Sequence, residues 1–130
     1  MSMRRVGAVL VLGFLYFVIG LVFGELAKHG ATRFWRLAAW LASGLLFVAH
    51  IGFDGLRAGG KPAATALRAA AAAALGAFGV AVAANVHSAR LHVGSPRLHL
   101  ALAVWPVLTA VGAFPVALLA GWVLSPRRRR

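Results

Sequence analysis

The sequence predicts an all-α integral membrane protein in which four transmembrane helices form a small bundle. Of its 130 residues, 62% are hydrophobic and only 12% are charged, whereas a typical soluble domain carries about 25% charged residues. The mean hydropathy is +0.86. Four long apolar stretches are separated by short polar segments. The length is enough for one domain, so residues 1–130 are expected to form a single membrane unit.

The first predicted span covers residues 6–24, which are uncharged and long enough to cross a hydrocarbon core of about 30 Å. This run exceeds the apolar core of a signal peptide, and Glu25-Leu26-Ala27-Lys28 follows it instead of a small-residue cleavage site. We therefore interpret it as a retained helix. Gly20 and Gly24 lie four residues apart, a spacing that favours close helix packing, either within the chain or with another chain.

The second predicted span, residues 37–53, has a polar stripe along one face. Steps of three and four residues place the members of this stripe above one another. The opposite face is wholly apolar. The stripe is therefore expected to face protein rather than lipid. It contains Arg36, Trp40, Ser43, Phe47, His50, Asp54 and Arg57.

The third predicted span, residues 66–86, is rich in alanine and glycine. Small residues on one helix face form a groove into which a neighbouring helix can sink. We interpret this span as the least hydrophobic of the four and place it in the bundle interior, with the second span's stripe in its groove and Asp54 near Arg68. The expected packing residues are Ala72, Gly76, Gly79 and Ala83.

The fourth predicted span, residues 100–124, contains no charge but two prolines, Pro106 and Pro115. Each proline removes one backbone donor and crowds the preceding turn. Membrane helices tolerate this where neighbouring groups compensate. The two prolines are interpreted either as static kinks that shape the bundle or as hinges.

The charge distribution predicts the topology. The net charge is +12, but the basic residues lie between apolar runs, so a nucleic-acid surface is not expected. Nine of the fourteen basic residues fall on the side that holds both termini. The positive-inside rule then places both termini in the cytoplasm. The Arg127–Arg130 tail is expected to contact anionic lipid. The excess of Arg over Lys is typical of GC-rich bacterial genomes and indicates a bacterial inner membrane.

One polar cluster is a candidate site at the inner interface: His50, Asp54, Arg57 and Arg68. Its simplest interpretation is an interfacial cap in which Asp54 pairs with an arginine. Histidine changes charge near neutral pH, and ionisable residues within membrane segments are candidates for function. A proton-responsive site is therefore the alternative interpretation.

A metal site is a weak alternative on the outer side. Imidazole and carboxylate groups ligate zinc or copper. However, the three histidines of residues 87–99 lack the i, i+4 spacing of a helical chelate, and the chain has no cysteine. We therefore predict no metal and no other cofactor. The weak candidates are Glu25, His29, His87, His92 and His99.

No catalytic constellation emerges from the sequence, and no enzyme activity is expected. Glu25 and Asp54 are the only two acids, and the predicted topology places them on opposite sides of the membrane. The expected function is a structural or accessory subunit, either as a homo-oligomer or in a larger membrane complex. The alternative is a small proton- or ion-coupled transporter that uses His50 and Asp54.

In length and number of spans, the chain resembles the small multidrug-resistance transporters. The resemblance implies a coupling carboxylate in the middle of the first span. Residues 6–24 contain no carboxylate, and Glu25 follows them. The resemblance therefore covers the topology only.

Overall fold

The protein is built from four helices that form a small bundle. The computed structural model describes residues 3–58, 61–92 and 96–124, with the backbone alone for Arg4 and residues 55–58. Each helix is long and apolar enough to cross a membrane, which is consistent with a multi-pass membrane protein. The all-α prediction is confirmed. The helices are α1 (Met3–Lys28), α2 (Thr32–Ala58), α3 (Pro62–Arg90) and α4 (Pro96–Leu124).

Each helix contains its predicted span and extends beyond it by several polar or charged residues. At the end of α1, Lys28 pairs with Glu25 one turn earlier, so the helix continues through the charged segment. Gly30 then turns the chain with a φ of +118°, a conformation that glycine adopts without steric cost. The Thr32 hydroxyl donates a hydrogen bond to the Ala27 carbonyl at 3.0 Å and closes this turn.

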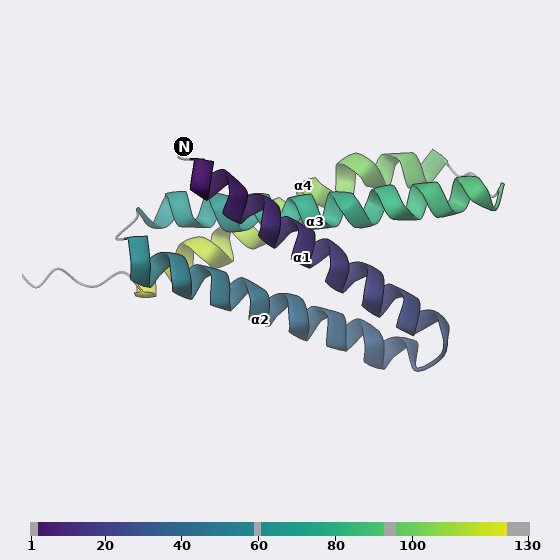
Figure 1. Cartoon of the computed structure of the whole chain (residues 1–130), viewed down its shortest axis with the longest axis horizontal. Helices are drawn as coiled ribbons and strands as arrows, with labels where there is room; N and C mark the ends of the chain where they lie inside the picture. The colour runs from purple at the N-terminus through teal and green to yellow at the C-terminus, as the bar shows by residue number, and fades with distance from the viewer. Residues whose placement is uncertain (1–2, 59–60, 93–95, 125–130) are drawn as a thin grey trace, which may run out of the picture.

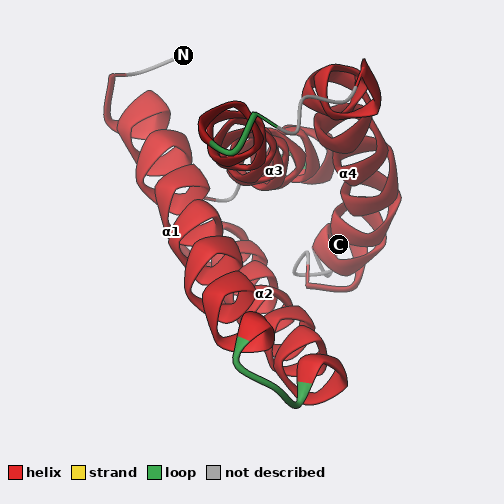
Figure 2. Cartoon of the chain, turned by 90° about the vertical axis from the view of Figure 1, so that its right-hand side faces the viewer, coloured by secondary structure: helices red, strands yellow, loops and turns green. Residues whose placement is uncertain are grey.

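The helices form two hairpins, α1–α2 and α3–α4, which converge at one end of the molecule and diverge at the other (Figure 1). The convergent end holds the end of α2, the beginning of α3 and the end of α4. There, Ile51 of α2 packs with Ala66 and Ala69 of α3 and with Ala117 of α4. Viewed from the divergent end, α1 and α4 stand on opposite sides of α3 (Figure 2).

The small-residue groove of α3 receives mainly α1 rather than the polar stripe of α2. A Cβ atom added to Gly76 would overlap the side chain of Tyr16, and one added to Gly79 would lie 2.7 Å from the Phe17 ring. In return, a Cβ added to Gly20 would lie 2.5 Å from a methyl group of Val80. Glycines on both helices thus accept large side chains from the partner, which brings the backbones close. At the convergent end, however, Phe47 of the stripe packs against the cluster that contains Ala72, and Asp54 pairs with Arg68. The expected packing of the stripe is therefore found there but not along the rest of the groove.

Candidate functional site

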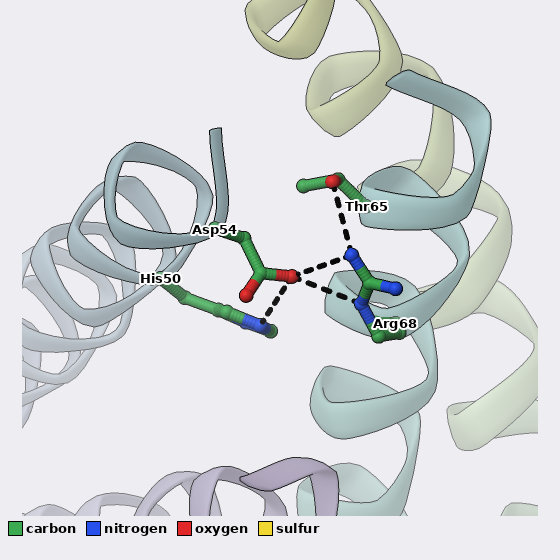
Figure 3. Close-up of polar contacts among 4 residues, drawn as sticks. All are labelled: His50, Asp54, Thr65 and Arg68. Atoms are coloured by element: carbon green, nitrogen blue, oxygen red, sulfur yellow. Dashed lines mark hydrogen bonds and ion pairs between the residues drawn. The ribbon is translucent and has the colours of Figure 1, made fainter. Parts of the chain in front are cut away.

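Asp54 and Arg68 form an ion pair between α2 and α3 at the convergent end (Figure 3). The Arg68 Nε and Nη2 atoms both donate to Asp54 Oδ2, at 2.9 and 2.8 Å. Arg68 Nη2 also donates to the buried hydroxyl of Thr65 at 3.2 Å. The side chains are only 12% exposed for Arg68 and 24% for Asp54. The expected proximity of these two residues is therefore found, although the two helices contact each other over a short length only.

His50 adds a buried imidazole to this pair. It lies one turn before Asp54, and its Nε2 atom is 4.0 Å from Asp54 Oδ2. That distance is too long for a hydrogen bond. Its Nδ1 atom is buried and has no hydrogen-bond partner among the described residues. The polar cluster His50–Asp54–Arg68, with Thr65, is thus a neutralised pair beside an imidazole that can still accept or donate a proton.

Two of the predicted polar elements lie outside the described side chains. The side chain of Arg57 belongs to the part of α2 whose backbone alone is described, and Arg127–Arg130 follow the last described residue. Their predicted roles, as a partner of Asp54 and as a lipid contact, stay predictions.

A long apolar groove lies between α2 and α4 and was not predicted from the sequence. Its volume is about 740 Å³, and it is open on one side. Residues of α3 line its floor, and residues of α2 and α4 line its sides. Along α4 the lining runs from Leu98 to Val116, a rise of about 27 Å at 1.5 Å per residue. The groove therefore follows most of the thickness of a hydrocarbon core.

Small residues occupy both sides of this groove. The lining includes Ser43 and Gly44 from α2 and Gly112 and Ala113 from α4. A Cβ atom added to Gly44 or Gly112 would have no other atom within 4 Å, leaving aside its chain neighbours and the adjacent backbone of the same helix. These glycines thus have no intramolecular packing role.

The remaining helix-packing candidates have mixed outcomes. Ala72 is fully buried and packs with Val9 and Tyr16, and Ala83 is half-buried. Gly24, in contrast, faces open space, so the Gly20–Gly24 pair does not act as one unit in intramolecular packing.

Pro106 and Pro115 both lie inside α4, which continues through them as one helix. The Thr109 hydroxyl donates to the Trp105 carbonyl at 2.8 Å, in the turn that contains the first proline. A side-chain bond of this kind provides a partner for a backbone group where a proline disturbs the helix. Whether the prolines act as kinks or as hinges stays a prediction.

Among the described residues, no group of three or more ligand side chains could hold a metal ion, so the weak metal alternative gains no support. Glu25 lies in the last turn of α1 and His29 follows this helix, whereas His92 follows α3 and His99 lies in the first turn of α4. His87, in the last turn of α3, is close enough to Glu25 to interact with it electrostatically. The two hairpins diverge toward the α1–α2 and α3–α4 connections (Figure 1).

Comparisons with protein families, curated proteins and solved structures gave no match to this chain. The function must therefore be argued from the cluster and the groove.

Proposed function

We propose that this protein is a complex-forming membrane subunit whose α2–α4 groove receives a transmembrane helix. The observation that carries the proposal is the pairing of a long apolar groove with small residues on both of its sides. In lipid, helix association depends on close packing, because lipid tails are as apolar as the side chains that they would replace. Glycine and serine permit such packing by letting helix backbones approach.

The proposal includes a location and an orientation. The protein resides in a bacterial inner membrane with both termini in the cytoplasm, as the distribution of basic residues favours. The convergent end with the polar cluster then lies on the cytoplasmic side. The divergent end of the groove, near Trp40 and Leu98, lies on the outer side.

Groove-filling variants test the proposal. Gly44 and Gly112 both line the groove, and a Cβ atom added to either would meet nothing within 4 Å, so Gly44→Leu and Gly112→Leu are expected to fill part of the groove. The tagged wild-type chain, purified in mild detergent from its host, is expected to run as a complex of defined stoichiometry, as measured by native mass spectrometry. Each groove-filling variant is expected to lose the additional chain while keeping its membrane level.

Gly24→Leu serves as the matched control, because Gly24 also faces open space but lies outside the groove. This variant should retain the additional chain. A wild-type particle that contains a single chain would contradict the proposal.

The second candidate function is a proton-coupled transporter, and the geometry of His50 favours it. The imidazole is buried beside the Asp54–Arg68 pair at the end where three helices converge. A proton gained by His50 would add a positive charge next to an already neutralised pair, which would weaken the contact between Asp54 and Arg68. Proton flux into liposomes measures this activity. Flux that exceeds empty liposomes and disappears in His50→Ala would favour transport, whereas equal flux in wild type and variant would exclude it.

A further inference from the structure

Two exposed arginines lie at the outer mouth of the α2–α4 groove, one on each side. Arg36 precedes the lining residue Trp40 by one turn of α2, and Arg97 precedes the lining residue Ala101 by one turn of α4. Residues four apart share a helix face, so both arginines continue the groove lining toward the end of their helix. In the proposed topology, this end of the groove lies at the outer aqueous interface. The charges of both arginines are therefore available to an occupant of the groove.

Within the part of the chain that the structure describes, neither arginine pairs with an acid. The only two acids are Glu25 and Asp54. Among the described residues, Glu25 pairs with Lys28, and Asp54 pairs with Arg68. Both carboxylates are therefore already engaged, and Arg36 and Arg97 take part in no ion pair of the described residues.

The excess of basic over acidic residues also disfavours a second copy of this chain as the occupant of the groove. Each copy carries a net charge of +12, and its two carboxylates already have basic partners. A second copy that entered the groove would bring further arginines toward Arg36 and Arg97. Like charges in proximity oppose association, most strongly where they are partly removed from water.

We infer that the groove binds a membrane-spanning helix of a different protein, and that this helix carries an aspartate or glutamate at its outer end. The inference rests on the proposed function and specifies the partner's chemistry. The apolar lining fits the helix body, and the small residues Ser43, Gly44 and Gly112 permit a close backbone approach. Arg36 and Arg97 supply the complementary charge. The headgroup of an anionic lipid would also pair with the arginines, but its binding would not be strengthened by glycine residues on the sides of the groove.

Photo-crosslinking within the native membrane tests the inference. A photo-crosslinking aromatic amino acid replaces Trp105, a large lining residue of α4, in the full chain, and mass spectrometry identifies the crosslinked segment. The expected product is a transmembrane segment of another protein with an acidic residue at its outer end. Replacing both rim arginines, Arg36→Gln and Arg97→Gln, is expected to lower the yield about fivefold, since two partly exposed ion pairs are lost. Arg90→Gln is the control, because Arg90 is an exposed basic residue at the same end, six residues and about a third of a helical rotation from Ala84, the last lining residue of α3.

The outcomes separate this inference from the proposed function. A crosslink to a segment without an acidic end, or to a second copy, would overturn the inference and leave the complex-forming function standing. A crosslink to lipid alone would overturn both. An unchanged yield in the double arginine variant, with an acidic segment still captured, would show that the arginines do not select the partner and would also overturn the inference.

Discussion

Asp54 and Arg68 form the ion pair that joins α2 to α3 at the convergent end. Their charges are largely removed from water, and three nitrogen–oxygen contacts join Asp54, Arg68 and Thr65. A buried ion pair adds little net stability compared with apolar residues of similar volume, but removal of one partner leaves an uncompensated charge. The pair therefore acts mainly as a constraint on how α2 meets α3.

Arg68→Leu is expected to lower the free energy of unfolding by roughly 2–3 kcal/mol, because it leaves the Asp54 carboxylate unpaired in a mostly buried place. The double variant Asp54→Leu/Arg68→Leu is expected to recover to within about 1 kcal/mol of the wild type. Denaturant titration in detergent, followed by tryptophan fluorescence, measures both. Equal destabilisation of the single and double variants would show that the charge imbalance is not the cause.

A second residue-scale prediction concerns the contact between Gly76 and Tyr16. Gly76→Ala places a methyl group against the Tyr16 side chain and 3.1 Å from the Gly13 carbonyl oxygen. Overpacking of this kind costs about 1–3 kcal/mol, although alanine itself favours the helix by about 1 kcal/mol. Gly24→Ala has the same intrinsic gain and meets nothing within 4 Å. In the same titration, Gly76→Ala should be less stable than wild type and Gly24→Ala should not; equal stabilities would contradict the α1–α3 packing.

At the scale of elements, α3 is the helix around which the others are arranged. A third of its apolar stretch is buried, against 11% for α2 and for α4. The interior position of this helix was predicted in part because its span was interpreted as the least hydrophobic of the four. The mean hydropathy is in fact lowest in α2, at 1.5 against 1.8 in α3. The small side chains of α3 therefore explain its position, because they permit close approach by α1 on one side and α4 on another.

Asn85 joins α3 to α4 near the divergent end. Its Nδ2 atom donates to the Ala81 carbonyl at 2.9 Å and to the Leu98 carbonyl at 2.7 Å. Asn85→Leu removes the bond between the two helices, which is worth about 1 kcal/mol. Hydrogen exchange is expected to accelerate by roughly fivefold at the beginning of α4, with little change in α1. Uniform acceleration in all four helices would contradict a local role.

At the scale of the whole molecule, the two hairpins share one end and separate at the other (Figure 1). The divergence leaves α2 and α4 without continuous packing, and the groove lies between them. The arrangement also places the α1–α2 and α3–α4 connections at the same end. Four membrane-crossing helices require these two connections to lie on one side of the bilayer.

Cysteine labelling tests this topology, because the chain contains no cysteine of its own. His29→Cys and Leu91→Cys, one in each connection, are expected to react with a membrane-impermeant maleimide added to intact cells. Met3→Cys, at the opposite end of the molecule, is expected to react only after the membrane is permeabilised. The labelled fraction on gels measures the difference. Labelling of His29→Cys and Leu91→Cys from opposite sides would contradict a four-span arrangement.

The sequence by itself determined the four spans, since a charge inside hydrocarbon is costly and the uncharged runs therefore mark the crossing segments. It also brought Asp54 close to Arg68, because the short connection between α2 and α3 places both near the same end. The tertiary structure was needed to show that α1, and not the stripe of α2, fills most of the groove of α3. Small residues permit close packing by any neighbouring helix, and the choice depends on which side chains match, as Tyr16 and Phe17 do with Gly76 and Gly79. The α2–α4 groove follows from that choice, since α1 takes the place where α2 was expected.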